Sequence, residues 1–254
     1  MIVGVIGTGL IGSSIGIRAQ ELGWHVIGFD ADAAAAGQAR AHGAIDEVAT
    51  PETIRERADT IVIAAHINGT IAHLEALRAA PPRNARLVID VSSVKAPIVA
   101  AARGVKHFVA THPMAGRERS GPTAATRDVF EGKTWLYVPT GDRELDWRAV
   151  DFIGAFGAIP FEIKADEHDR IVAFTSHLPQ ILATLFARSG KSGIDAYMGP
   201  TAKELLRLSR SSDAMWHDIL QHNRENIARE LRALAQRARD AADDLESVYK
   251  AGER

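Results

Sequence analysis

The sequence predicts an α/β protein, in which a doubly wound parallel sheet is followed by an all-helical domain. Short β-rich runs alternate with helical stretches through the first half, a pattern typical of a parallel sheet covered by helices. A glycine-rich turn follows the first run directly and opens a helix. After about residue 164, glycine becomes scarce and leucine, alanine and alternating charge dominate. We therefore place one domain at residues 1–164 and a helical domain at residues 165–254.

The strands of the first domain are expected at seven short apolar runs, whose length suits strands buried on both faces. These runs are residues 2–6, 25–29, 60–64, 86–91, 107–111, 134–138 and 158–163. Helical composition between them predicts crossover helices at residues 10–22, 31–42, 69–79 and 96–103.

Two apolar patterns characterise the helical half. Residues 171–188 are apolar nearly all round, which predicts a helix that is enclosed on most sides and kinked by Pro179. From Met215 to Val248, apolar residues recur mainly three and four positions apart, which predicts one stripe on a long helix. That stripe packs either on the chain's own core or on a second subunit, and the spacing leaves both readings open.

Charge and composition exclude several classes of protein. The 30 basic and 32 acidic residues give a net charge of −2, so nothing draws the chain globally toward nucleic acid or an anionic membrane. Without cysteine there is no disulfide, thiolate metal site or thiol nucleophile. The N-terminal apolar run lacks a basic segment before it and is too short to span a membrane. We expect a cytoplasmic protein with a small-molecule partner, and neither nucleic acid nor membrane.

The glycine-rich turn has the spacing of a dinucleotide site. Gly7 permits a tight turn, Gly9 lets a pyrophosphate approach the backbone, and Gly12 allows the helix to pack closely on the strand. Leu10 and Ile11 complete the turn and begin the helix, whose free N–H groups favour an anion. The alternative is a glycine-rich turn without a ligand. The context predicts a Rossmann-type dinucleotide-binding domain over residues 1–164.

Asp30 lies at the end of the second predicted strand, 18 residues after Gly12. A carboxylate there can accept hydrogen bonds from an adenosine ribose, whereas a 2′-phosphate would meet like charge, to which Asp32 adds. The expected cofactor is therefore NAD rather than NADP. Asp30 is also a candidate N-cap for the following helix.

A nicotinamide enzyme that oxidises a carbinol needs a base for the hydroxyl proton, and histidine suits this role. Among the ten histidines, position favours two. His112 follows a predicted strand at the carboxyl edge of the sheet, where ligands of such sheets bind, and His177 lies inside the apolar helix. A structural, hydrogen-bonded histidine is the alternative for each.

Three segments together resemble the prephenate/arogenate dehydrogenase family of tyrosine biosynthesis: Asp90-Val91-Ser92-Ser93-Val94-Lys95, His112-Pro113-Met114-Ala115-Gly116 and Ser176-His177-Leu178-Pro179. The opening glycine turn and the stretch from Arg207 to Ile219 are also similar to that family, so the likeness covers nearly the whole chain.

This resemblance implies NAD-dependent oxidative decarboxylation of prephenate to 4-hydroxyphenylpyruvate. NAD takes a hydride from the ring carbinol carbon, the ring carboxylate leaves as carbon dioxide, and the ring becomes aromatic. His112 is implied to accept the hydroxyl proton and Ser93 to orient its neighbours, while His177 and Arg207 bind substrate, with Arg210 as a weaker stand-in for Arg207. Residues 165–254 are implied to bind substrate and to form a homodimer through the C-terminal helices.

Two positions depart from the family pattern, and other functions stay open. Gln180 stands where many relatives have histidine, and His66 occupies a turn near the expected cofactor where relatives usually have proline. An arogenate or dual-specificity dehydrogenase, a β-hydroxyacid-type reductase and a non-catalytic NAD-binding sensor are the alternatives. We expect no metal site, because His217 and His222 are five residues apart and no partner motif accompanies His168.

Overall fold

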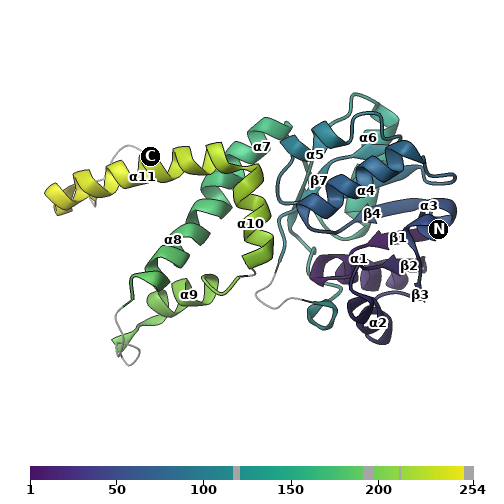
Figure 1. Cartoon of the computed structure of the whole chain (residues 1–254), viewed down its shortest axis with the longest axis horizontal. Coiled ribbons are helices and arrows are strands. Elements are labelled where there is room, and N and C mark those ends of the chain that lie inside the picture. The colour runs from purple at the N-terminus through teal and green to yellow at the C-terminus, as the bar shows by residue number, and fades with distance from the viewer. Residues whose placement is uncertain (117–120, 191–196, 212, 249–254) are drawn as a thin grey trace.

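The first half of the chain folds as a parallel sheet with helices on both faces, as predicted (Figure 1). The structure is a computed structural model that describes residues 1–116, 121–190, 197–211 and 213–248. The six strands lie in the order β3-β2-β1-β4-β5-β6. Strands β2 and β3 are added on one side of β1 and strands β4 to β6 on the other, so the strand order switches between β1 and β4. The strands are β1 (Ile2–Ile6), β2 (His25–Phe29), β3 (Glu47–Val48), β4 (Thr60–Ile63), β5 (Leu87–Asp90) and β6 (Phe108–Val109).

Two apolar cores lie on the two faces of this sheet. One contains Ile15 of α1 and Phe152 of α6, and the other contains Ile54 of α3, Leu74 of α4 and Ile98 of α5. Helices α3 and α6 and strand β3 were not predicted. The helices of this half are α1 (Leu10–Glu21), α2 (Ala33–Ala41), α3 (Pro51–Arg57), α4 (Ile67–Ala79), α5 (Ala96–Ala101) and α6 (Arg143–Ala155).

Of the last three predicted strands, only the start of the first continues the main sheet. The run at 107–111 divides after β6, and its end joins a separate sheet in the order β7-β8-β9, with β7 antiparallel to β8 and β8 parallel to β9. The division has a local cause, because the N–H of Thr111 donates to the side chain of Asp90 rather than continuing the backbone ladder with β5. The three strands are β7 (Thr111–Pro113), β8 (Thr134–Tyr137) and β9 (Ile159–Glu162).

The predicted helix at 171–188 is interrupted. Helix α7 (Ala165–Val172) passes into a π-helical turn, Ala173–His177, which is followed by α8 (Leu178–Arg188). Pro179 has no N–H to donate, and its ring clashes with the carbonyl one turn earlier in a regular helix, so a wider turn before it relieves both problems. In the single chain α8 is not enclosed, because Leu185 is 50% exposed.

The predicted long helix from 215 is also divided. Helix α10 (Asp213–His222) and helix α11 (Arg224–Asp243) meet at Asn223, which leaves the helical conformation with φ −120° and ψ 23°. The apolar residues of the predicted stripe lie in two different environments. Ile219 and Ile227 are buried in the chain's own core, whereas Leu245 and Val248 are largely exposed.

The helical half packs on the first half through α7 and α10, which contact α5 and α4 (Figure 1). The amide of Asn68 in α4 donates to the Asp218 carboxylate in α10 at 2.8 Å, and its oxygen lies 2.8 Å from Nε2 of His222. Helix α9 (Pro200–Leu208) packs on α8.

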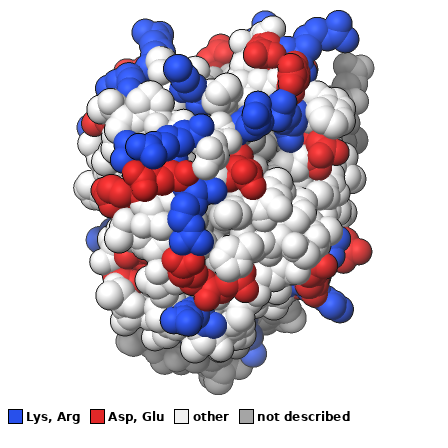
Figure 2. Space-filling view, turned by 90° about the vertical axis from the view of Figure 1, so that its right-hand side faces the viewer, with Lys and Arg blue, Asp and Glu red and all other residues white. Residues whose placement is uncertain are grey.

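On the face of the first half that points away from the helical half, basic and acidic side chains are interspersed (Figure 2). Within the described residues, no helix is long and apolar enough to cross a membrane.

Candidate active site

The glycine turn between β1 and α1 combines tight packing with open space. Gly7 has φ +96°, and a Cβ there would lie 2.5 Å from the carbonyl oxygen of Ala64. A Cβ on Gly12 would lie 1.9 Å from the carbonyl oxygen of Gly7. At Gly9, by contrast, a Cβ meets nothing of the described chain within 4 Å. The first two positions therefore need glycine for packing, and the third leaves the start of α1 accessible to an anion.

Leu10 and Ile11 begin α1, where the first N–H groups of the helix lack intrahelical partners. A fourth glycine, which sequence reasoning missed, lets α1 lie against the loop after α2. A Cβ on Gly16 would be 1.9 Å from the carbonyl oxygen of Ala44. Its spacing of four residues from Gly12, on one face of the helix, was the available signal.

Asp30, at the end of β2, holds the glycine turn. Its Oδ2 accepts hydrogen bonds from the backbone N–H of Thr8 at 2.7 Å and from the Thr8 hydroxyl at 3.1 Å. The N-cap of α2 is Asp32, which accepts from the N–H of Ala34 at 2.9 Å, so the N-cap reading of Asp30 is wrong. The turn and Asp30 together provide the features that a dinucleotide needs: an accessible helix start and a carboxylate beside it.

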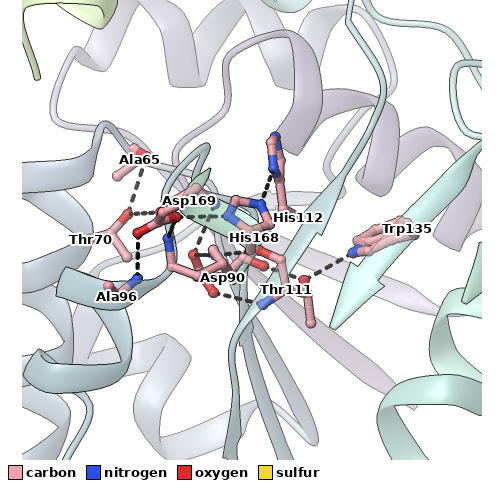
Figure 3. Close-up of polar contacts among 11 residues, drawn as sticks. Ala65, Thr70, Asp90, Ala96, Thr111, His112, Trp135, His168 and Asp169 are labelled. Carbon is pink, nitrogen blue, oxygen red and sulfur yellow. Dashed lines mark hydrogen bonds and ion pairs between the residues drawn. The ribbon is translucent and has the colours of Figure 1, made fainter. Parts of the chain in front are cut away.

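A fully buried ion pair lies beneath the end of β5. Nζ of Lys95 is 2.5 Å from Oδ2 of Asp90 and donates to the carbonyl oxygen of Thr111 at 2.5 Å. Asp90 also accepts from the N–H groups of Ser92 and Thr111, each at 2.9 Å. Trp135 donates to the Thr111 hydroxyl at 2.9 Å (Figure 3). These bonds brace the chain immediately before His112, so Lys95 holds the loop in place.

His112 comes from β7 and meets a second histidine from α7. Its Nδ1 lies 2.8 Å from Nε2 of His168, whose Nδ1 lies 2.7 Å from Oδ1 of Asp169 (Figure 3). His112 is half-buried and His168 is buried. Burial, followed by the nearby His168, Lys95 and His177, moves the pKa of His112 well below 6.5. His112 is therefore neutral at neutral pH, which leaves a lone pair on one of its ring nitrogens.

Asp169 is also bound to the first half of the chain. Its two carboxylate oxygens accept the backbone N–H groups of Lys95 at 2.7 Å and Ala96 at 2.9 Å, at the start of α5. A carboxylate at a helix N-terminus satisfies free N–H groups and suits the helix dipole. The sequence pattern did not reveal a role for His168 or Asp169, and it excluded a metal motif at His168. Among the described residues, no group of three or more candidate ligands is arranged for a metal ion.

His177 ends the π-helical turn and is buried in the same network. Nδ2 of Asn223 lies 3.2 Å from Nδ1 of His177 and donates to the carbonyl oxygen of Asp169 at 2.7 Å. Burial lowers the pKa of His177 to about 4. The ring of Trp216 packs edge-on against it, with 5.7 Å between centroids. Nε1 of Trp216 is buried and has no hydrogen-bond partner in the described structure, so this donor is unsatisfied.

The structure links His112 and His177 but not the other two predicted side chains. Ser93 is half-buried in the loop between β5 and α5, and its hydroxyl forms no hydrogen bond within the described chain. His168, rather than Ser93, contacts His112. Arg207 lies on α9, where Nε and Nη2 donate to Glu204 at 2.8 and 2.5 Å, and no hydrogen bond joins it to the histidines.

Both positions that depart from the family pattern have a structural setting. Gln180 joins α8 to the end of α9, because its Nε2 donates to the carbonyl oxygen of Leu208 at 2.7 Å and its Oε1 accepts from Ser211 at 3.3 Å. His66 is exposed and precedes α4, next to the Ala64–Ala65 backbone against which Gly7 packs.

Comparison with known proteins connects this site to one family. The profile described as prephenate dehydrogenase, nucleotide-binding domain, matches residues 15–154, and that described as prephenate dehydrogenase, dimerization domain, matches residues 164–250. A probable prephenate dehydrogenase of Streptomyces niveus, NovF, is 33% identical over 96% of this chain and 68% of its own length. The prephenate dehydrogenase of Bacillus subtilis is 32% identical over 87% of this chain and 64% of its own length.

A relative with a different substrate name is the cyclohexadienyl dehydrogenase of Zymomonas mobilis, which is 25% identical over 87% of this chain and 80% of its own length. The fold matches the Aquifex aeolicus prephenate dehydrogenase solved with hydroxyphenyl propionate and NAD+, with a TM-score of 0.88, 22% identity, and coverage of 97% of this chain and 91% of that one. The chain spans 64–80% of the length of these curated relatives. On these matches, the chain belongs to the prephenate dehydrogenase family, whose members are NAD-dependent oxidoreductases.

Proposed function

We propose that this protein catalyses the NAD-dependent oxidative decarboxylation of prephenate to 4-hydroxyphenylpyruvate. The observation that carries the proposal is the position of His112. It lies at the end of the β6–β7 run, with Nδ1 engaged by His168 and with Nε2 making no hydrogen bond within the described chain. A neutral imidazole with one free nitrogen suits removal of a hydroxyl proton.

The cofactor is proposed to lie on the glycine turn. The start of α1 beside Gly9 is proposed to take the pyrophosphate, and Asp30 is proposed to accept a hydrogen bond from the adenosine ribose; the open space at Gly9 supports the first role. NAD, when bound, accepts the hydride from the ring carbinol carbon. His112 takes the hydroxyl proton, and the electron pair of the C–C bond that breaks to release carbon dioxide makes the ring aromatic. The phenolate oxygen formed in this way regains a proton to give the hydroxyl of the product. The protein therefore has mainly to bind, align and remove one proton.

Prephenate carries two carboxylates, so its site needs donors and positive charge. His177, Arg207 and the unpartnered Nε1 of Trp216 are the proposed groups, and Ser93 is proposed to orient the reacting partners. Arg207 holds Glu204 with two hydrogen bonds. Binding of a substrate carboxylate by Arg207 would therefore compete with this ion pair.

A homodimer is proposed through the helical half. Five apolar side chains are each 37–53% exposed along the α7–α8 segment: Ile171, Phe174, Leu182, Leu185 and Phe186. Such a cluster favours a partner surface. Light scattering should give twice the chain mass, Leu185→Glu should lower it, and Trp147→Glu, at an exposed apolar position in the first half, should not. A monomeric wild type would contradict the dimer. The domain limits at residues 164 and 165 and a cytoplasmic location stay predictions.

The decisive experiment follows NADH formation when the purified protein meets prephenate and, separately, arogenate. We expect turnover with prephenate, and a loss of ~10²–10⁴ in kcat for His112→Ala with NAD affinity nearly unchanged. His25→Ala is the matched control, because the His25 side chain is 46% exposed and lies at the end of β2 that is opposite to Asp30. Full activity of His112→Ala would contradict its role as the base.

The second candidate is an arogenate or dual-specificity enzyme, which the cyclohexadienyl dehydrogenase relative favours. The two substrates differ only in a keto or an amino group on the side chain. Faster turnover with arogenate would replace prephenate as the preferred substrate. NAD binding without turnover of either compound would instead favour a non-catalytic sensor.

A further inference from the structure

We propose that His168 and Asp169 are positioning residues that hold His112 as the tautomer protonated on Nδ1, so that Nε2 is the atom that accepts the substrate proton. This inference rests on the proposed function and assigns a role to two residues that are adjacent in sequence on α7. It starts from an unbroken series of polar contacts: His112 Nδ1 to His168 Nε2 at 2.8 Å, and His168 Nδ1 to Asp169 Oδ1 at 2.7 Å.

The carboxylate sets the direction of these bonds. Asp169 already accepts two backbone N–H groups at the start of α5, and an ionised carboxylate can only accept. The hydrogen between His168 and Asp169 must then be carried by Nδ1 of His168. Burial lowers the pKa of His168, which favours the neutral ring, so its Nε2 presents a lone pair. His112 must in turn donate from Nδ1.

The consequence for His112 is a fixed tautomer. A neutral imidazole has one donor and one acceptor nitrogen, so a proton on Nδ1 leaves the lone pair on Nε2. The chain thereby presents a proton acceptor to the substrate without a rearrangement of the ring. The opposite tautomer would leave two lone pairs facing each other between His112 and His168, in a buried position where an unmade hydrogen bond is costly.

The same contacts stabilise the product of the proton transfer. When Nε2 takes the hydroxyl proton, His112 becomes an imidazolium, while the hydride and its electron pair go to NAD. Around His112, His168, Lys95 and His177 oppose a positive charge, whereas Asp169 and Asp90 favour a positive charge on the neighbouring His168. His168 passes the influence of Asp169 to His112 through its two ring nitrogens. This is the role of the buried acidic residue behind a catalytic histidine in other enzymes.

The arrangement also makes the base depend on docking of the two halves. His112 belongs to β7, whereas His168 and Asp169 belong to α7, the first helix of the helical half. His168 lies 56 residues after His112 in the chain. Asp169 joins the halves and orients His168 with one side chain, because Oδ1 contacts both His168 and the N–H of Lys95.

The direct test is NMR of the protein labelled with ¹⁵N-histidine, in which each ring nitrogen reports whether it carries a proton. We expect protonated Nδ1 and unprotonated Nε2 for His112 in the wild type at neutral pH. A proton on Nε2 would overturn the proposal. This measurement needs no substrate, so it separates the tautomer from the proposed function, which fails if neither prephenate nor arogenate is turned over.

Variants of His168 provide the kinetic test. His168→Leu removes the acceptor and should lower kcat at least tenfold, with the KM for NAD within about twofold of the wild type. His168→Gln supplies an amide oxygen in place of Nε2 and should recover most of the lost activity. Asp169→Asn, which removes the negative charge, should move the acid limb of kcat/KM to lower pH, because the imidazolium loses its compensation.

His25→Leu serves as the matched control and should leave kcat and the pH profile unchanged. Melting of each variant by circular dichroism shows whether it is folded, and the NMR measurement decides the matter if His168→Leu is not. Wild-type kcat in His168→Leu, or a leucine variant and a glutamine variant that lose activity equally while both remain folded, would refute the positioning role.

Discussion

Replacing Lys95 with methionine should destabilise the protein strongly, because it leaves the Asp90 carboxylate buried without its cation. Nζ of Lys95 makes two contacts at 2.5 Å, to Asp90 and to the carbonyl oxygen of Thr111, and both side chains of the ion pair are at most 1% exposed. Methionine has a similar length but no donor. Removing one partner of a buried pair costs about 3–5 kcal/mol. For a chain of this size, Tm should fall by roughly 2–4 °C per kcal/mol, or about 6–20 °C in all.

The assay is thermal and guanidinium unfolding of the cofactor-free protein, followed by circular dichroism at one pH. Lys106→Met is the matched control, since Lys106 is exposed, and it should change the free energy of unfolding by less than about 0.5 kcal/mol. Adding Asp90→Asn to Lys95→Met removes the unpaired charge. The double variant should therefore be more stable than the sum of the two single effects predicts. A Lys95→Met protein with the same Tm and the same free energy of unfolding as the Lys106→Met control would refute the reasoning.

Three further predictions concern the cofactor site and pH. Gly9→Ala should keep the wild-type Tm but weaken NAD binding by titration calorimetry, whereas Gly12→Ala should lower both, because its Cβ would lie 1.9 Å from a carbonyl oxygen; equal Tm values for the two variants would contradict this. Asp30→Asn keeps an oxygen for Thr8 and removes like charge, so the ratio of kcat/KM for NADP to that for NAD should rise about tenfold or more; an unchanged ratio would count against the selectivity assigned to Asp30. His177 has a folded pKa of about 4 against 6.5 for an unperturbed histidine. The unfolded chain therefore binds more protons between these values, so stability is fully present above pH 6.5 and is lost, by up to about 3 kcal/mol, as pH falls toward 4. His177→Gln should flatten that part of the stability profile, and parallel profiles for the two proteins would argue against the assignment.

The first half of the chain was predictable because its signals are local. A glycine turn, the strand before it and the carboxylate after the next strand each depend on a few neighbouring residues. The structure accordingly has β1 and β2 with the predicted bounds and the predicted glycine geometry at Gly7, Gly9 and Gly12. Short elements such as β3 and α3 were missed, since their two and seven residues carry too little periodicity.

The candidate site was predictable only in part. The motif around His112 and the position of His177 were read from the sequence, but their connection was not. It runs through His168, Asp169 and Asn223, whose polar side chains in a helical segment resemble an ordinary solvated face. The same buried bonds explain the break between α10 and α11 at Asn223, where the periodicity predicted one helix.

Local patterning thus fixed the fold class, the nucleotide turn and the family of this chain, because backbone propensity, glycine sterics and short motifs act within a few residues. Packing decided which nitrogen of His112 is engaged, which carboxylate lies behind its partner His168, and where the helices of the second half break. The reason is that burial makes each polar group find a partner, and here the partners come from elements 46–74 residues apart in the chain.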